Sequence, residues 1–192
     1  MLDPERPAGN GALLPAGPLR RPAVTLREAG RLVFVLEGDE AVAESTRAWA
    51  ARLAPGVPLL ALRRTALGVS APGLREVEPL PRGARVGLLS GVGSPARFER
   101  FARALGLDVR GHASFSNHAS WRRRDLGLAL DDLARAGSAC VLLTEKDEPR
   151  WPPGLRSPMP VQVLRTALTP LEPPEAALAP LRDALAGGPA FG

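Results

Sequence analysis

Two short polar segments carry residue types that could bind or transfer phosphate. Residues 144–147 read Thr-Glu-Lys-Asp directly after an apolar run, and Lys146 is the single lysine of a chain that otherwise uses arginine. A lysine ammonium is a compact charge with three donors, which a guanidinium does not reproduce. From the residues alone, this segment is equally well a ligand site or a solvated loop.

The second segment is glycine-rich and precedes a helix. Residues 90–94 read Ser-Gly-Val-Gly-Ser and are followed by Pro95, so a helix is expected to begin here with Ser94 as N-cap. Glycines at such a place let backbone N–H groups approach an anion, and the helix dipole favours negative charge there. An ordinary strand-to-helix turn would have the same sequence.

The remaining candidate residues stand alone in the sequence, and each also has a non-functional explanation. His118 lies in a Phe-Ser-Asn-His segment, and a single histidine is more often structural than catalytic. His112 has no supporting pattern. Asp3 stands close to the first residue, where chain ends are often frayed. Asp131 and Asp132 are expected to form a solvated helix face.

The composition excludes several classes of site. A P-loop requires Gly-Lys-Ser/Thr, and Lys146 lies between two acidic residues, so these 192 residues contain no such loop. The HExxH and GxSxG motifs are absent, two histidines and one cysteine lack zinc spacing, and Cys140 alone forms no internal disulfide. No apolar run reaches the roughly 18 residues of a membrane span.

The net charge of +5 is open to two explanations. It follows either from a general preference for arginine or from attraction to phosphate-bearing partners such as nucleotides, anionic lipid or nucleic acid. Aromatic residues are only 4% and tyrosine is absent, which leaves few platforms for stacking bases. We therefore expect no nucleic-acid partner.

Apolar periodicity gives the elements that must position these segments. Residues 1–23 are expected to be loop because prolines and glycines interrupt them. In the first half we expect strands over 31–37 and 58–64, a helix from Asp39 to Leu53, and one more short strand near 74–80. In the second half we expect strands over 85–90, 107–115, 139–143 and 161–168, and helices over 95–105, 124–136 and 175–186.

This alternation indicates an α/β fold with a mostly parallel sheet and helices on both faces. Ligands of such sheets bind beyond the carboxyl ends of the strands. Residues 91–94 and 144–147 both follow a predicted strand directly. The fold therefore predicts that the two segments lie at the same edge of the sheet.

Four segments, in order along the chain, resemble one enzyme family. Residues 2–20 are similar to the D-x-x-R-x-x-G-N-G-x-x-L-P-A-G-P-L-R segment of tetraacyldisaccharide 4′-kinases, the lipid A 4′-kinases. Residues 91–98 are similar to that family's G-I-G-x-P-x-x-F, residues 115–118 to its F-x-D-H, and residues 144–147 to its T-E-K-D. The long irregular first segment is the most specific of these.

The resemblance implies a kinase of lipopolysaccharide synthesis with ATP and Mg²⁺ as cofactors. It would transfer the γ-phosphoryl group to the 4′-hydroxyl of a tetraacylated disaccharide 1-phosphate, a lipid A precursor, at the cytoplasmic face of the inner membrane. By the same resemblance, Asp3 matches a Walker-B-type metal-binding aspartate, and His118 matches a catalytic histidine. The expected cofactor-binding residues are Gly91, Gly93, Lys146 and Asp147.

The chain also departs from the family pattern. The family's P-loop, catalytic aspartate and membrane anchor lie upstream of the segment that matches Met1, and Asn117 replaces the usual aspartate before the histidine. We therefore expect residues 1–30 to be a remnant of the nucleotide-binding domain. Residues 31–83 are expected to be linking strands and a helix, and residues 84–192 to form a C-terminal α/β domain of the P-loop-kinase family.

Two functional hypotheses follow. In the first, the chain is the C-terminal part of a lipid A 4′-kinase and is inactive alone, as a result of a misplaced start, a split gene or a decayed copy, and a separate chain is one possible source of the missing half. In the second, it is a non-catalytic basic module that binds anionic lipid or a partner kinase chain. The family resemblance implies a peripheral location at the cytoplasmic face of the inner membrane.

Overall fold

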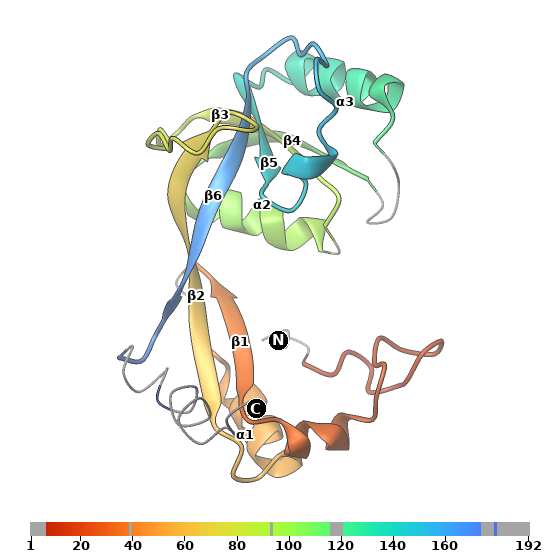
Figure 1. Cartoon of the computed structure of the whole chain (residues 1–192), viewed down its shortest axis with the longest axis vertical. Coiled ribbons are helices and arrows are strands. Elements are labelled where there is room, and N and C mark those ends of the chain that lie inside the picture. Colours follow the sequence, from red (N-terminus) through yellow and green to blue (C-terminus); the bar gives the residue numbers. More distant parts are fainter. Residues whose placement is uncertain (1–6, 39, 93, 116–120, 174–178, 180–192) are drawn as a thin grey trace, which may run out of the picture. The chain divides into compact units, whose positions relative to one another are not determined.

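Helices and strands alternate along most of the chain, as the apolar periodicity predicts. The computed structural model describes residues 7–38, 40–92, 94–115, 121–173 and 179 (Figure 1). In chain order its elements are η1 (Ala23–Glu28), β1 (Leu32–Glu37), α1 (Glu44–Leu53), β2 (Leu59–Ser70), β3 (Arg85–Ser90), α2 (Pro95–Ala104), β4 (Asp108–Ser114), α3 (Arg123–Arg135), β5 (Cys140–Thr144), η2 (Glu148–Arg150) and β6 (Val161–Pro170). Hydrogen bonds order the strands β1-β2-β6-β5-β3-β4.

The chain divides into two compact units, and β2 and β6 each run from one into the other. Unit 1 comprises residues 1–64 and 168–192, and unit 2 comprises residues 65–167. In unit 1, β1 pairs in parallel with the first part of β2, from Leu32 opposite Leu59 to Glu37 opposite Arg64. A small apolar core, which includes Phe34 and Ala50, joins β1 to α1.

The irregular segment before η1 is organised by one side chain. Asn10 donates from Nδ2 to the carbonyl of Ala16 (2.9 Å) and accepts from the backbone N–H of Ala12 at Oδ1 (3.1 Å). A Cβ on Gly17 would lie 2.2 Å from that same Oδ1. The Gly-Asn-Gly and Leu-Pro-Ala-Gly strings therefore specify an asparagine-centred loop in which a residue larger than glycine does not fit at position 17.

Unit 2 contains the parallel sheet that bears the predicted site. β3 pairs in parallel with both β4 and β5, and β5 pairs in parallel with β6. Because side chains alternate across a strand, neighbouring leucines of β3 serve opposite faces. Leu88 packs with Phe98 and Phe101 of α2, whereas Leu89 packs with Leu126 and Leu130 of α3.

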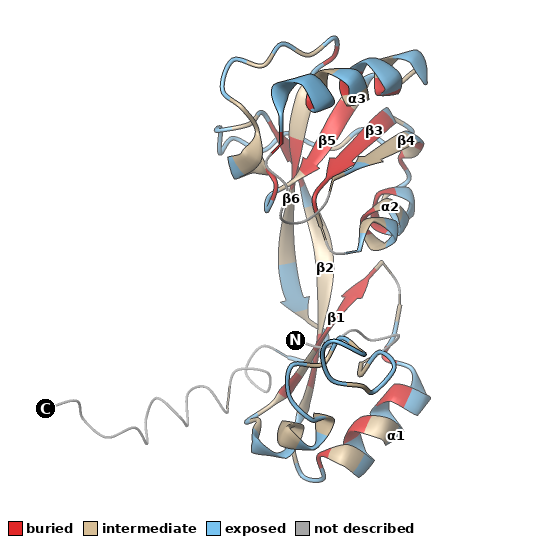
Figure 2. Ribbon diagram, turned by 90° about the vertical axis from the view of Figure 1, so that its right-hand side faces the viewer, coloured by how far each residue is buried: buried red, intermediate tan, exposed pale blue. Residues whose placement is uncertain are grey.

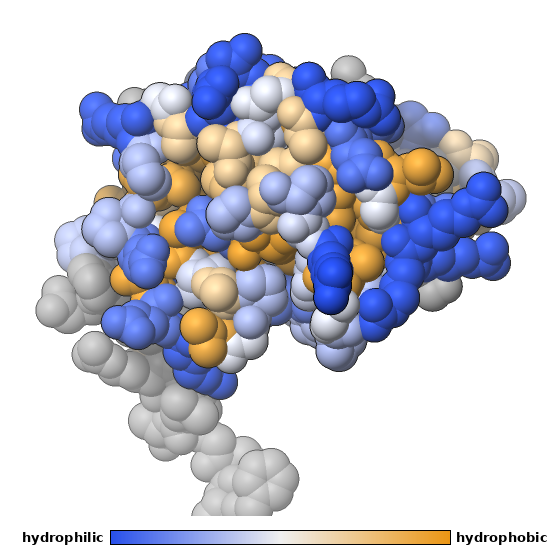
Figure 3. All heavy atoms as spheres, turned by 90° about the horizontal axis from the view of Figure 1, so that it is seen from above, coloured by the Kyte–Doolittle hydropathy of each residue, from blue (hydrophilic) through white to orange (hydrophobic). Residues whose placement is uncertain are grey.

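Both faces of this sheet are thus covered by a helix, and β3 and β5 are buried between them (Figure 2). The predicted α/β fold class is confirmed. Exposed polar residues cover the outer surfaces. Figure 3 shows hydrophilic side chains in several separate groups around apolar ones on one face.

Some element boundaries differ from the expectations. The expected strand at 74–80 is wrong, because only Glu78 forms a bridge there, to Val69. β2 continues to Ser70, beyond the expected end at 64, and α1 begins at Glu44 with Ala43 as N-cap. η1 was not expected. The helix expected over 175–186 lies outside the described residues.

The described part of the chain lacks two features. None of its helices has the length and apolar character needed to cross a bilayer. None of its histidine, cysteine, aspartate and glutamate side chains gather in threes where a metal ion could bind.

Candidate functional site

The site lies where two adjacent parallel strands of unit 2 end. β3 ends at Ser90 and β5 at Thr144, and the two strands are hydrogen-bonded neighbours from Val86 opposite Cys140 to Leu89 opposite Leu143. Their carboxyl ends therefore share one edge of the sheet, the edge at which ligands of open α/β sheets bind. Gly91, directly after β3, and Asp147, in the turn after β5, are brought together, as the sequence predicts.

Asp147 joins the two turns. Its side chain is fully buried, and Oδ2 accepts hydrogen bonds from the backbone N–H of Gly91 (3.0 Å) and from the hydroxyl of Thr144 (2.7 Å). Arg150, in η2, places Nη1 3.4 Å from the other oxygen, Oδ1. A buried carboxylate is stable only with such partners. Asp147 therefore acts as an internal clamp between the two turns.

Gly91 lies in a crowded place where a larger residue would displace its neighbours. A Cβ there would lie 2.5 Å from Nη1 of Arg150, 3.1 Å from Oδ1 of Asp147 and 3.3 Å from Nε1 of Trp121. The indole N–H of Trp121 is buried and has no hydrogen-bond partner in the described part of the chain. Gly91 thus allows a carboxylate, a guanidinium and an indole donor to converge on the backbone at the end of β3.

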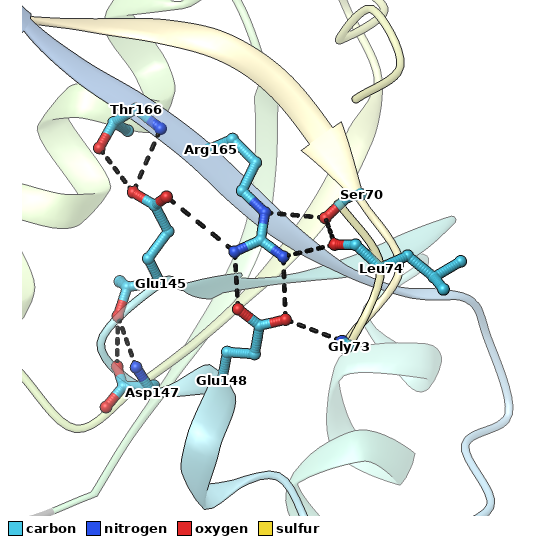
Figure 4. Close-up of polar contacts among 9 residues, drawn as sticks. Ser70, Gly73, Leu74, Glu145, Asp147, Glu148, Arg165 and Thr166 are labelled. Carbon is cyan, nitrogen blue, oxygen red and sulfur yellow. Dashed lines mark hydrogen bonds and ion pairs between the residues drawn. The ribbon is translucent and has the colours of Figure 1, made fainter. Parts of the chain in front are cut away.

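A second cluster starts at the residue after Asp147. Glu148 forms a two-pronged ion pair with Arg165 of β6, with Nη1 to Oε2 at 2.6 Å and Nη2 to Oε1 at 2.9 Å (Figure 4). The same guanidinium donates from Nε to the hydroxyl of Ser70 (2.8 Å) and from Nη2 to the carbonyl of Leu74 (2.9 Å). The backbone N–H of Gly73 donates to Glu148 Oε1 (2.8 Å).

This cluster ties the loop after β2 to the turn after β5. The hydrogen bond between the Glu148 and Arg165 side chains is the main reason why the pKa of Glu148 is lowered. The same hydrogen bond raises the pKa of Arg165. Glu145 approaches the same guanidinium at 4.0 Å and accepts from the backbone N–H (3.2 Å) and hydroxyl (3.0 Å) of Thr166 (Figure 4). Thr144, Glu145, Asp147 and Glu148 are thus each held by a charged or hydroxyl partner.

A cavity of about 430 Å³ lies beside this cluster. Its wall is formed by Leu67, Leu74 and Val77, which are 60%, 58% and 41% exposed. Its polar lining residues are Gly73, Arg75, Glu145, Glu148 and Arg165. The loop after β2 and the turn after β5 therefore share one open, partly apolar surface.

Comparison with known families now adds to this geometry. A model of the tetraacyldisaccharide-1-P 4'-kinase family matches residues 1–184. The chain belongs to this family. The expectation from its four motifs is confirmed, and the match includes the Asn10-centred loop, the Gly91 turn and the Thr-Glu-Lys-Asp turn.

Relatives named tetraacyldisaccharide 4'-kinase share a large part of the sequence. The protein from Anaeromyxobacter dehalogenans strain 2CP-1 is 40% identical over 159 residues, which cover 81% of this chain and 42% of that protein. The protein from Rhodopseudomonas palustris strain BisB5 is 36% identical over 157 residues, which cover 82% and 43%. The chain thus spans less than half the length of the curated kinases it matches.

A solved structure shares the fold. It is a crystal structure of LpxK from Aquifex aeolicus in complex with ATP, which matches with a TM-score of 0.51 at 22% sequence identity. The match covers 91% of this chain and 48% of that one. At this identity the comparison supports the α/β architecture of the family member and carries no statement about its ligands.

The structure describes three of the six predicted site residues, and their functional roles stay predictions. Gly91 and Asp147 are in direct contact, and both are engaged by other protein groups. Lys146 lies exposed between Glu145 and Asp147. Asp3, Gly93 and His118 lie outside the described residues, so their assignment as metal-binding, cofactor-binding and catalytic residues stays a prediction.

Sequence reasoning missed several residues of this kinase-family site. Arg150 and Arg165 were not singled out among the many arginines, although each contacts an acidic residue of the segment from 145 to 148. His112, which has no motif around it, lies 2.8 Å from the hydroxyl of Ser90. A signal existed only for Arg150, which lies three residues after Asp147.

Proposed function

We propose that these residues form the C-terminal part of an ATP-dependent tetraacyldisaccharide 4′-kinase. The whole enzyme transfers the γ-phosphoryl group of ATP to the 4′-hydroxyl of a tetraacyldisaccharide 1-phosphate in lipid A biosynthesis. The observation that carries the proposal is the family match over residues 1–184. The related proteins are about twice as long as the matched segment, and their names support the same activity.

Bound ATP with Mg²⁺ would supply the phosphoryl group and neutralise its charge, since phosphoryl transfer depends mainly on positioning and electrostatics. The described residues fit a supporting role toward this nucleotide. Both Oδ atoms of Asp147 face protein donors, so this carboxylate shapes the turn and is not available to a metal ion. Lys146, exposed on the same turn, presents a compact charge suited to a phosphate oxygen.

The α2 helix adds a second favourable feature. It is ten residues long and begins with Pro95 directly after the turn clamped by Asp147, so its dipole makes the surroundings of that turn attractive to an anion. The proposal assigns His118 to catalysis and Asp3 to Mg²⁺ by motif alone. It places the enzyme at the cytoplasmic face of the inner membrane, with the lipid A precursor as substrate.

The loop that grips the terminal phosphates must come from residues outside this sequence, because a P-loop lysine is absent from it. The test is a phosphoryl-transfer assay with the purified 192-residue chain, ATP, Mg²⁺ and the tetraacylated disaccharide 1-phosphate. We expect no 4′-phosphorylated product from the chain alone. Product formation at a rate above the buffer blank would overturn the assignment of these residues as an incomplete kinase.

The alternative, a basic module that binds anionic lipid without catalysis, rests on the net charge of +5. Flotation with anionic and neutral vesicles distinguishes the two. Binding that requires anionic lipid and is lost at high salt supports the module, because surface electrostatic attraction is screened by salt. Absence of vesicle binding removes the lipid-binding form of the alternative and leaves binding to a partner kinase chain.

A further inference from the structure

His112 contacts residues on both sides of the turn clamped by Asp147. On the side before the turn, its Nε2 lies 2.8 Å from the hydroxyl of Ser90, the last residue of β3. On the side after it, the imidazole meets the ring of Phe98 edge-on, with centroids 5.9 Å apart, and its Nδ1 lies 3.6 Å from Oε2 of Glu99. The two ends of the turn are thus joined through one titratable ring.

The charges around the ring fix its neutral tautomer. Glu99 is held by Arg103, whose Nε and Nη2 donate to Oε1 at 3.1 and 2.9 Å, and this hydrogen bonding lowers the pKa of Glu99. The carboxylate faces Nδ1, so the proton of a neutral imidazole belongs on Nδ1. Nε2 is then left to accept the hydroxyl hydrogen of Ser90.

The order serine, histidine, glutamate is also that of a hydrolase triad, but the geometry excludes a nucleophilic role. Ser90 has no exposed surface, so a substrate cannot reach its hydroxyl. The backbone N–H of Gly91, next to it, donates to Asp147 and is not free to stabilise an oxyanion. The contact between Ser90 and His112 is therefore internal to the fold.

We propose that His112 is a proton-dependent positioning residue for the turn after β3, holding it when neutral and releasing it when protonated. A protonated ring carries hydrogens on both nitrogens, so Nε2 becomes a donor and no longer accepts from Ser90. The hydroxyl oxygen of Ser90 then accepts from Nε2, and among the described residues no second acceptor is in contact with its hydrogen, which is costly in a fully buried place. The strain falls on the next residue, Gly91, and on its bond to Asp147.

The surroundings set the direction of the pH response. β3 presents only the neutral hydroxyl of Ser90 to the ring, and α2 presents Glu99 with Arg103 behind it. β4 is the last strand in the sheet order, so no further strand flanks it there. Burial lowers the pKa of His112, and the negative charge of Glu99 opposes part of that shift. The turn is thus held at neutral pH and released on acidification.

The coupling itself is tested without nucleotide or lipid. The isotope-labelled 192-residue chain carrying His118→Asn contains His112 as its single histidine, so one imidazole titrates. Its ring signals and the amide signal of Gly91 are followed by NMR from about pH 8 to about pH 4.5. We expect the Gly91 amide to shift with the same midpoint as the ring. A Gly91 amide that does not change through the His112 titration would overturn the proposal.

Two variants show whether Ser90 transmits the effect. With Ser90→Ala, His112 still titrates, but most of the Gly91 response is lost; an undiminished response would refute transmission through the hydroxyl. With Glu99→Gln, the attraction that raises the pKa of His112 is removed, so the ring midpoint falls. The Gly91 midpoint must fall with it, and a Gly91 midpoint that stays in place contradicts the proposal.

The catalytic consequence rests on the proposed function, whereas the coupling does not. If the Gly91 amide follows His112 and a complete enzyme built with these residues lacks kinase activity, the proposed function fails and the positioning role stands. If the complete enzyme is active and the Gly91 amide does not respond to the His112 titration, the proposed function stands and the positioning role fails. In an active enzyme, the positioning role predicts an acid limb in kcat whose midpoint moves down with Glu99→Gln.

Discussion

The carboxylate of Asp147 lies 3.0 Å from the backbone nitrogen of Gly91, and it joins the turns that follow two neighbouring strands. The two residues are 56 positions apart in the sequence, and each belongs to a separate family motif. The contact joins the two motifs in this chain. One provides a backbone with room for a buried carboxylate, and the other provides the carboxylate.

Replacing Asp147 by asparagine tests this clamp. The side-chain amide would direct hydrogens at groups that are themselves donors, namely Gly91 N–H, the Thr144 hydroxyl or Arg150. We expect Asp147→Asn to lower the free energy of unfolding by about 1–3 kcal/mol, measured by urea denaturation. The matched control is Asp132→Asn in the exposed part of α3, where a change within about 0.5 kcal/mol is expected. Equal effects at both sites would contradict the clamp.

A methyl group at position 91 tests the packing. Gly91→Ala places a Cβ against Arg150, Asp147 and Trp121, and overfilling a packed site costs about 1–3 kcal/mol. Gly127→Ala is the control, because no atom lies within 4 Å of a Cβ there and alanine favours the helix by about 0.5–1 kcal/mol. The melting temperature should therefore fall in Gly91→Ala and rise in Gly127→Ala. A stabilising Gly91→Ala would show that the convergence at Gly91 is looser than described.

The ion pair between Glu148 and Arg165 predicts a pH dependence. The pKa of Glu148 is lowered from its ordinary 4.5, chiefly by hydrogen bonding to Arg165. A lowered carboxyl pKa contributes stability that is present above pH 4.5 and is lost as the pH falls through the folded-state value. Arg165→Met should destabilise the fold by about 1–3 kcal/mol at neutral pH and make the loss of stability on acidification shallower.

The control for this experiment is Arg135→Met, which removes an exposed ion pair to Asp132 and should change neither quantity appreciably. Hydrogen exchange gives a second readout, because Arg165 also holds Ser70 and Leu74. The amides after β2 should lose protection in Arg165→Met alone. Unchanged protection would mean that the loop is held by other contacts.

A substitution at Lys146 tests whether this residue has a functional role or a structural one. It is exposed on the turn, so Lys146→Gln should leave the melting temperature unchanged. In a complete enzyme that contains this chain we expect kcat to fall about 10²-fold, the size of effect seen when one charge-stabilising donor is removed. Arg135→Gln, an exposed change on α3, serves as control. An unaffected kcat would remove Lys146 from the site.

Much of the fold could be predicted because local patterns determine it. Phe98, Phe101 and Ala102 recur with helical spacing and form the buried face of α2. The length of β2 could not be predicted, because Arg63, Arg64 and Gly68 interrupt its apolar pattern. Gly68 has a φ of +144° and a Cβ there would lie 2.2 Å from the carbonyl oxygen of Glu78, so it belongs to a close backbone approach that no local signal reveals.

The site shows the same division. Gly91 and the segment from 144 to 147 could be found because they follow strands and form motifs. Arg165 reaches Ser70 across 95 positions and His112 reaches Ser90 across 22, so neither contact has a signal in the neighbouring sequence. These partners depend on strand order and register, which apolar periodicity leaves open.

A chimeric enzyme tests the central claim most directly. The 159-residue segment of the Anaeromyxobacter dehalogenans kinase that matches this chain is replaced by the corresponding residues of this chain, and transfer of labelled γ-phosphate from ATP to the 4′-position of the disaccharide is measured. We expect the folded chimera to form 4′-phosphorylated product and the isolated chain to form none. A folded chimera without activity, or an isolated chain with activity, would contradict the account.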